Sequence, residues 1–462
     1  MRVLLVTYDH PFRGRSGVAA YCRDLLAELR GRGIEVVHLY GAERSWVPGS
    51  RLRRRIEQGI RLVSLVNSPA PPALSVDRPL QDRGCSALDR LLTTFFEEVR
   101  PDVVHVHSLM GFTGSLLRSA KRTGLPVVVT LHDFWALCTR ISLVRTDGTP
   151  CGGPDEGVNC ARFCARTESR RRRLYRRLLA VLPSGPLRTA VERAANLYLR
   201  ASAHGPREGS GRPTRLPLLQ DVRTHGERTR RLVEDLLGAD RLLAVSGFVR
   251  DVYGRHGVPE GRMQVLPLGL GVVGRVRWRV RHASSPVRFG YLGRLSPFKG
   301  AHLLAQVARE IPADRARFLF FGPASARTCE ELRRLAGGRP LEFYGPYRRE
   351  DLPRILEGID VAVVPTLFQE TVGLTALEPQ AAGVPVIASA LGALPEWVEH
   401  GHNGLLFPSG DAAALRRLIL LVAESPDLVA RFSANTRPPL SIREHVEELL
   451  RIYEECRSVC RV

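Results

Sequence analysis

The chain has almost no lysine. Of its 68 lysine and arginine residues, only Lys121 and Lys299 are lysines, and the other 66 (68 − 2) are arginines. Lysine carries a compact point charge, whereas arginine presents a wide planar fork. Lys299 stands near the end of residues 293–300 (GRLSPFKG), five positions after Arg294. This exception predicts a loop in which a compact ammonium group and an arginine together hold a diphosphate.

Long hydrophobic runs are also missing. No stretch reaches the roughly 20 apolar residues that a membrane-spanning helix requires. The first residues, MRVLLVTYDHPF, are apolar only as far as Asp9 and His10, so they predict a buried strand and not a signal peptide. We therefore expect a cytoplasmic protein whose nine cysteines are mostly reduced.

Acidic residues are too few to balance the arginines. The net charge of +21 and the pI near 10.5 favour anionic partners such as phospholipid, nucleic acid or phosphorylated substrates, although a solvated surface with counterions is an alternative. No basic surface interleaved with aromatic residues is apparent, which argues against nucleic acid. Residues 51–66 predict a basic amphipathic helix for an anionic membrane surface, or a solvated helix face, and residues 169–177 are also rich in arginine.

The 462 residues predict two α/β domains. Short valine-rich runs alternate with helical patterns, which is typical of parallel sheets covered on both faces. We expect a first Rossmann-like domain over residues 1–268, with a cysteine- and arginine-rich insertion at about 138–233. A second Rossmann-like domain is expected over residues 286–435. Residues 436–462 should form a helix that packs back on the first domain.

The strongest motif lies in the second half, where Glu370 and Glu378 are eight positions apart in FQETVGLTALEPQ. Between them we expect a loop entering a helix, with Thr371 as its cap and Gly373 allowing close approach of a ligand. A helix N-terminus favours phosphate. Glu378 can accept two hydroxyl groups of a ribose, and Glu370 can accept those of another polyol. Alternatively, both glutamates are solvated.

Taken together, these segments resemble glycosyltransferase family 4, the retaining enzymes of the GT-B fold. The motifs are GRLSPFKG, then ETVGLTALEPQAAGVPVIAS, and also LAVSGFVRDVYGRHGVP, GIDVAVVPTLFQE and GALPEWVEHGHNGLLFPSGD. In the first half, PFRGRSGVAAYCRDLLAELRGRGIEVVHL and DVVHVH…PVVVTLHDFW are similar as well. The resemblance covers most of the chain, except about residues 166–233 and the last twenty or so.

The resemblance implies a role for each matching residue of the second domain. Arg294 and Lys299 would neutralise the donor diphosphate as it leaves. Glu378 would bind the nucleotide ribose, and Glu370 would act at the catalytic centre by holding hydroxyl groups of the donor sugar. The backbone N–H groups of Gly373 and Leu374 would meet sugar or phosphate oxygens.

In the first domain, the resemblance implies that His132 is a catalytic residue that approaches the donor sugar. A histidine at a strand end is otherwise often only a satisfied polar residue. Gly17 would lie near the diphosphate and the acceptor. The family usually has two adjacent glycines at this point, whereas this chain has Ser16 and Gly17.

The implied reaction is the transfer of a sugar from a nucleotide-sugar to a hydroxyl acceptor with retention at the anomeric carbon. No carboxylate pair of the kind used by retaining glycoside hydrolases is evident, so front-face attack is favoured. No DxD-type metal motif is visible, and we expect no metal cofactor in catalysis. Members often act on lipid-linked acceptors, which implies glycan, glycolipid or secondary-metabolite biosynthesis and peripheral contact with the inner membrane face.

Two other functions are compatible with these residues. One is a sugar-nucleotide epimerase or a phosphorylase of the same fold, although Lys121, on a first-domain helix, is badly placed to carry a pyridoxal group. The other is a non-catalytic basic scaffold that binds a membrane. The donor-site residues favour the transferase over both.

Four of the cysteines follow the HDFWAL segment closely: Cys138, Cys151, Cys160 and Cys164. Four thiolates can hold a structural zinc ion in tetrahedral geometry. Their spacing predicts such a site, which would order the insertion and take no part in the chemistry. The alternatives are ordinary reduced thiols or a regulatory disulfide.

Overall fold

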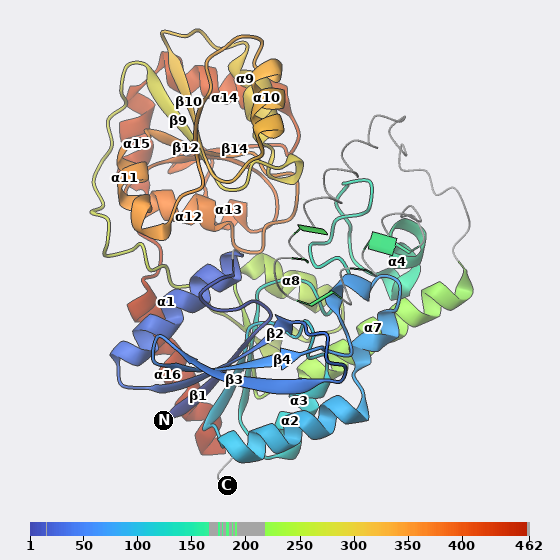
Figure 1. Cartoon of the computed structure of the whole chain (residues 1–462). Helices are drawn as coiled ribbons and strands as arrows, with labels where there is room; N and C mark the ends of the chain where they lie inside the picture. The colour runs from blue at the N-terminus through green and yellow to red at the C-terminus, as the bar shows by residue number, and fades with distance from the viewer. Residues whose placement is uncertain are drawn as a thin grey trace. The chain divides into compact units, whose positions relative to one another are not determined.

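The computed structural model describes residues 1–14, 16–165 and 218–459, together with positions 174, 175, 178, 182, 183, 187, 190 and 191. The chain divides into two compact units (Figure 1). The first comprises Met1–Val245, Val249–Leu266 and Val446–Val462, and the second comprises Ser246–Phe248 and Pro267–His445. Each unit is a parallel α/β structure, which confirms the predicted fold class.

The sheet of the first unit has the strand order β3-β4-β2-β1-β5-β6-β7-β8. The strands are β1 (Arg2–Thr7), β2 (Glu35–Glu43), β3 (Arg51–Glu57), β4 (Ile60–Val66), β5 (Val103–Val106), β6 (Val127–Leu131), β7 (Arg241–Ala244) and β8 (Met263–Val265). All neighbours are parallel except β3 and β4. The chain order reverses between β1 and β5. In open α/β sheets, ligands bind outside the carboxyl ends of the strands at such a switch point.

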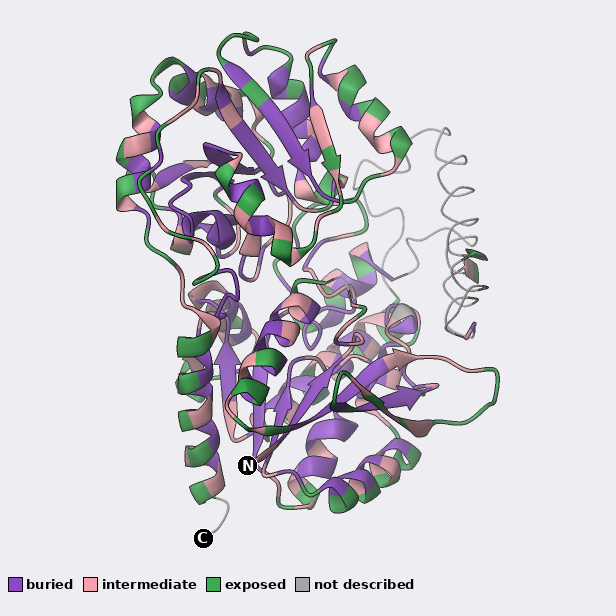
Figure 2. Ribbon diagram, turned by 60° about the vertical axis from the view of Figure 1, so that its left-hand side comes forward, coloured by how far each residue is buried: buried purple, intermediate pink, exposed green. Residues whose placement is uncertain are grey.

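Helices complete the first unit and bury its sheet. They are α1 (Gly17–Gly31), α2 (Ser86–Val99), α3 (Ser115–Arg122), α4 (Val158–Phe163), α7 (Leu219–Leu237), most of α8 (Gly247–Arg255) and most of α16 (Ile442–Val459). Short 3-10 turns include η1 (Pro72–Leu74), η2 (Pro79–Arg83), η3 (Asp155–Gly157) and η5 (Glu260–Arg262). Strands β5 and β6 are buried along their whole length, as valine-rich central strands should be (Figure 2).

The helix predicted for residues 51–66 is wrong. This segment is the antiparallel hairpin of β3 and β4, in which Glu57 pairs with Ile60 across the turn. Gln58 and Gly59 both have positive φ, 52° and 71°, which is the backbone of the tight turns that match the twist of paired strands. Because this segment is not an amphipathic helix, the main sequence argument for membrane contact no longer holds.

The second unit has the strand order β11-β10-β9-β12-β13-β14, all parallel. The strands are β9 (Val287–Leu292), β10 (Ala316–Phe321), β11 (Glu342–Gly345), β12 (Val361–Val364), β13 (Val386–Ser389) and β14 (Gly404–Phe407). The helices are α9 (Ala301–Ala308), α10 (Ala326–Leu335), α11 (Leu352–Glu357), α12 (Leu374–Gln380), α13 (Leu394–Trp397), α14 (Ala412–Glu424) and α15 (Asp427–Asn435), with turns η6 (Pro297–Lys299) and η7 (Arg349–Asp351). The chain order reverses between β9 and β12, so this sheet has its own switch point.

Part of the predicted insertion is described. Residues 138–165 contain η3 and α4. The last part of the predicted insertion belongs to the amphipathic helix α7. Most of the arginine-rich stretch 169–177 lies outside the described residues. Among the helices that the structure describes, none is both long enough and apolar enough to cross a membrane.

Candidate functional site

In the second unit, Lys299 and Glu370 meet at the switch point. Lys299 follows β9 and Glu370 follows β12, the two strands between which the chain order reverses. The Lys299 Nζ donates to Glu370 Oε1 at 2.6 Å, and it also lies 4.6 Å from the centre of the Phe368 ring. An ammonium group has three donors, so Lys299 can keep Glu370 and still bind phosphate oxygens. The structure thus brings together two residues that the sequence places 71 positions apart.

The loop that carries Lys299 is fastened from both sides. The buried Tyr291 hydroxyl donates to the Arg294 carbonyl at 2.8 Å and to the Lys299 carbonyl at 3.4 Å. On the other side, Leu367 N donates to Phe298 O at 2.8 Å. Gly300 has φ +72°, and a Cβ there would lie 1.7 Å from Pro365 O. Only glycine fits this close approach, which holds the Lys299 loop against the end of β12.

Arg294 is the cation of this loop that no group in the described part of the chain neutralises. It is exposed, and its guanidinium has no hydrogen-bond or ion-pair partner within the part of the chain that the structure describes. With Lys299 it gives one loop two positive groups. The guanidinium of Arg294 has five N–H donors and is exposed just after a buried strand. Such a group is suited to bind a phosphate.

Gly373 and Leu374 form the start of α12, as the motif predicts. Gly373 is the N-cap, with φ +77°, and a Cβ on it would lie 2.6 Å from Leu394 Cδ2. The predicted cap, Thr371, does not cap the helix, because Gly373 in the left-handed region turns the chain directly into the first helical turn. Glu370 is held in place by its own backbone, since its carbonyl accepts from Ala393 N at 2.9 Å.

Glu378 lies inside α12 and is 4% exposed. The structure gives it a partner that sequence reasoning missed: Arg349 Nη1, from the turn after β11, donates to Glu378 Oε1 at 2.9 Å. Tyr347 lies beside this pair, and burial, with a smaller contribution from the Glu378 charge, raises the pKa of its phenol.

In the first unit, Gly17 is the first residue of α1, directly after the β1 loop. Ser16, which replaces the usual first glycine, is the N-cap: its Oγ accepts from Ala19 N at 3.1 Å and donates to Asp9 Oδ2 at 2.8 Å. Serine is among the best N-cap residues. The departure from the family pattern therefore strengthens the helix start and does not remove it.

His132 follows β6 and is 6% exposed. Its Nε2 lies 2.9 Å from Nδ1 of His107, which follows β5. The sequence contains this second histidine in DVVHVH, but the spacing of 25 residues gave no reason to pair the two. The first unit therefore offers a histidine pair at the carboxyl edge of its sheet, next to the switch point.

Asp133, the next residue, provides a test of the electrostatics. Burial raises its pKa to about 6. The hydrogen bond from Trp135 N and the charge of Arg228 lower the pKa, but by less than burial raises it. The folded state then holds a proton that the unfolded state loses near pH 4, so folding stability falls as the pH rises from about 4 to about 6, by up to about 3 kcal/mol. At neutral pH that cost is complete.

We therefore expect Asp133→Asn to be more stable than the parent chain at pH 7.5, by about 2 kcal/mol, and equally stable at pH 4. Asparagine keeps the Oδ1 acceptor for Trp135 N and removes the ionisation. Urea unfolding at several pH values measures the difference. A gap that stays constant from pH 4 to pH 7.5 would contradict a raised pKa for Asp133.

The zinc site predicted for Cys138, Cys151, Cys160 and Cys164 finds no support. All four side chains are buried and none forms a disulfide. Within the described residues, no group of three or more histidine, cysteine or acidic side chains is arranged to hold a metal ion. Burial raises the pKa of the Cys164 thiol to about 12 and also raises that of Cys138. In this structure the four cysteines are buried free thiols, and Cys151 Sγ donates to Gly153 O at 3.4 Å.

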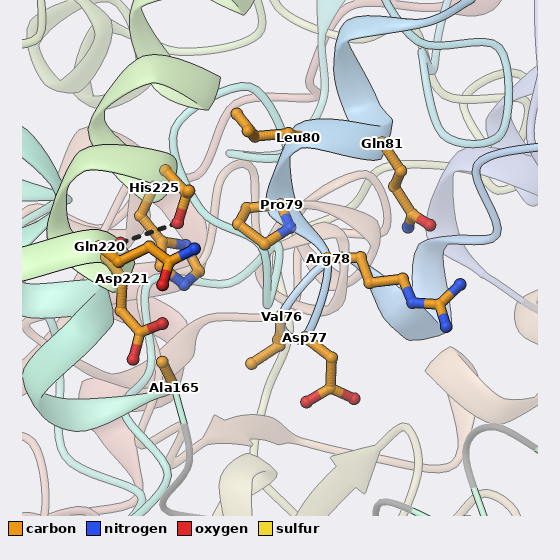
Figure 3. Close-up of a pocket in the computed structure, with 11 residues that line it drawn as sticks. Val76, Asp77, Arg78, Pro79, Leu80, Gln81, Ala165, Gln220, Asp221 and His225 are labelled. Carbon is orange, nitrogen blue, oxygen red and sulfur yellow. Dashed lines mark hydrogen bonds between the residues drawn. The ribbon is translucent and has the colours of Figure 1, made fainter. Parts of the chain in front are cut away.

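A cavity of about 470 Å³ lies in the first unit; none of the predicted donor-site residues lines it, and its lining includes Ala165, next to Cys164 (Figure 3). Residues 76–81 of the η1–η2 segment form one wall, and the first turns of α7 form the other. The wall from residues 76–81 mixes polar groups such as Arg78 with apolar ones such as Pro79, whereas the α7 residues that line the cavity, such as His225, are polar. No residue of this cavity belongs to the motifs that carry the family resemblance.

Comparison with known families agrees with the division into two units. The model described as "Glycosyl transferase 4-like domain" matches residues 16–202, and that described as "Glycosyl transferases group 1" matches residues 286–425. Among curated relatives, D-inositol 3-phosphate glycosyltransferase of Corynebacterium jeikeium is 32% identical over 184 residues, 36% of this chain and 43% of the relative. Its counterpart from Geodermatophilus obscurus is 30% identical over 236 residues, 46% of this chain and 52% of the relative. The matches thus span about half of these relatives' length.

Solved structures are similar over the whole chain. The Anabaena protein HepE in complex with UDP has a TM-score of 0.60 at 15% identity, covering 98% of this chain and 100% of that one. Sucrose-phosphate synthase from Thermosynechococcus elongatus has a TM-score of 0.58 at 18% identity, covering 100% and 98%. These likenesses establish the GT-B fold.

Proposed function

We propose that this chain, which belongs to glycosyltransferase family 4, transfers a sugar from a nucleotide-sugar donor to a hydroxyl group of an acceptor, with retention at the anomeric carbon. One observation carries the proposal. At the switch point of the second unit, Lys299 is paired with Glu370 at 2.6 Å, and the same loop carries Arg294, whose exposed guanidinium has no partner among the described residues. This arrangement fits a diphosphate next to a polyol.

In this proposal, the donor lies along the carboxyl ends of β9 and β12. Arg294 and Lys299 bind the diphosphate, and their positive charge stabilises it as the bond to the sugar breaks. Glu378 accepts hydroxyl groups of the ribose, and Arg349 fixes the orientation of its carboxylate. Glu370, oriented by Lys299, accepts hydroxyl groups of the sugar. Gly373 and Leu374 present backbone N–H groups at the start of α12.

Retention follows from attack on the same face from which the diphosphate leaves. The departing phosphate oxygen takes the proton of the acceptor hydroxyl, so no enzyme carboxylate has to form a covalent intermediate. In such a scheme, most of the increase in reaction rate comes from holding the donor sugar, the acceptor hydroxyl and the leaving diphosphate in the correct relative orientation. His132 supplies a hydrogen bond to the donor sugar from the first unit, and Gly17 lies at the start of a helix on the same unit.

The alternative enzymes are disfavoured by particular residues. A phosphorylase of this fold needs a lysine for its pyridoxal group, but Lys121 lies on α3 and donates to both oxygens of Asp240, at 2.7 and 2.8 Å. An epimerase would release the sugar altered at a ring carbon and would need no acceptor. A scaffold would have no use for the Lys299–Glu370 pair.

Binding of a nucleoside diphosphate is the first consequence to measure. We expect UDP, the nucleotide bound to HepE, or one of GDP, ADP and TDP to raise the melting temperature, because a ligand that binds only the folded state stabilises it by about 2.7 kcal/mol at 100 times its Kd. Glu378→Ala should remove most of this shift, whereas Glu330→Ala, on the exposed face of α10, should leave it unchanged. A chain that no nucleotide stabilises would contradict the proposed donor.

A further inference from the structure

Three histidines gather at the carboxyl edge of the first sheet. His105 lies in β5, His107 directly follows β5, and His132 directly follows β6, the neighbouring parallel strand. All three are buried, with 0%, 2% and 6% of their surface exposed. The family resemblance implies a role only for His132, so the other two need an explanation of their own.

The contact between His107 and His132 restricts how His132 can act. The distance of 2.9 Å between His107 Nδ1 and His132 Nε2 requires one N–H between the two rings. Nε2 of His132 is therefore committed, and any hydrogen bond from this ring to a substrate must use Nδ1. The Tyr21 ring of α1 packs against both imidazoles, 5.6 Å from His107 and 5.3 Å from His132, which limits their rotation.

The ring of His105 packs against the ring of His107. The His105 ring centre is 4.0 Å from that of His107. His105 itself is fixed at both nitrogens: Nδ1 lies 2.5 Å from the Tyr453 hydroxyl of α16, and Nε2 lies 2.7 Å from Thr130 Oγ1. The imidazole of His107 thus packs against a ring that two hydrogen bonds hold in place. A continuous set of contacts connects Tyr453 of α16, through His105 and His107, to His132.

We propose that His107 is a positioning residue that fixes the ring orientation and the tautomer of His132, with His105 and Tyr453 as its support. This rests on the proposed function, because it requires His132 to contact the donor sugar. A histidine whose other nitrogen makes a defined hydrogen bond presents one known proton state to its ligand. His107 thereby determines whether Nδ1 of His132 donates or accepts at the sugar.

Substitution of His107 separates positioning from folding. His107→Leu removes the hydrogen bond and should lower kcat by about 100-fold, the scale of losses from misplaced catalytic groups, while the donor Kd changes by less than about twofold. His107→Asn places an amide at the position of Nδ1 and should recover most of the rate. His38→Leu is the matched control: His38 is equally buried in the same sheet and bonds Thr7 Oγ1 at 2.8 Å. Its kcat per folded molecule should equal that of the parent chain.

The nitrogen-15 spectrum of the histidine rings reads the tautomer directly. The signals of His132 are assigned by their loss in His132→Asn. In the parent chain they should report one tautomer, and in His107→Leu a mixture of both. If His132→Asn keeps full activity, the assignment of His132 in the proposed function fails. If His132→Asn is impaired but His107→Leu keeps its kcat or an unchanged spectrum, the positioning role alone is refuted, as it is if His107→Asn is no better than His107→Leu.

Discussion

Replacing Lys299 by alanine should lower the rate of sugar transfer by about 10² to 10³-fold, which is the usual cost of removing one preorganised group that stabilises developing negative charge. Lys299 is predicted to contact the diphosphate in the transition state, where its charge rises as the bond to the sugar breaks. We expect the loss mainly in kcat, with a smaller rise in the KM for the nucleotide-sugar. Steady-state release of the nucleoside diphosphate measures both.

The pair with Glu370 supplies the control for this result. Lys299→Ala leaves a nearly buried carboxylate without its 2.6 Å donor, so part of the loss can come from a shifted Glu370. The double variant Lys299→Ala with Glu370→Gln removes that carboxylate charge. If the double variant regains the parent rate, Lys299 serves only to neutralise Glu370, and its assignment to the diphosphate is refuted.

Replacing Arg228 by methionine should lower the free energy of unfolding by about 3 to 5 kcal/mol, the typical cost of removing one partner from a buried ion pair. Arg228 on α7 and Asp82 in η2 are 1% and 0% exposed at their side chains, and Nε donates to Asp82 Oδ2 at 2.6 Å. Arg228 also donates to the carbonyls of Trp135 and Ala136, at 2.7 and 3.3 Å. Urea unfolding at pH 7 measures the loss.

Two further measurements test whether the loss comes from burial of the ion pair: its pH dependence, and the same substitution in an exposed ion pair. Burial already raises the pKa of Asp82, and the Arg228 charge opposes that rise. Without Arg228 the pKa rises further, so the damage should shrink at pH 5, where Asp82 can take a proton. Arg317→Met breaks a bidentate but exposed pair with Glu342 and should cost under about 1 kcal/mol. Equal losses for the two variants would contradict the burial argument.

Sequence patterns predict the parts of this protein that depend on local chemistry. Valine-rich runs identify the central strands because a parallel sheet buries both of its faces. The Lys299 loop and the start of α12 are predicted from their local motifs, and in the structure Gly300 and Gly373 adopt positive φ there, which few other residues can do.

The failures share a physical cause. In residues 51–66 the apolar positions 52, 56 and 60 fit a helix, but even spacing fits a strand equally well, and Gln58–Gly59 is a weak turn signal compared with Asn–Gly. Arg349 and His107 meet Glu378 and His132 across 29 and 25 residues, so only the packed sheets reveal these pairs. The predicted zinc site finds no support among the described residues, because cysteine spacing does not fix where buried thiols point.

The most direct test of the account measures donor turnover. The purified chain is incubated with UDP-, GDP-, ADP- and TDP-glucose and a panel of hydroxyl acceptors, and nucleoside diphosphate release and the anomeric configuration of the product are followed by proton NMR. We predict that at least one donor is consumed, that the product keeps the donor's anomeric configuration, and that Lys299→Ala and His132→Asn are at least about 100-fold slower. Donor consumption at the parent rate in Lys299→Ala, or an inverted product, would contradict the account.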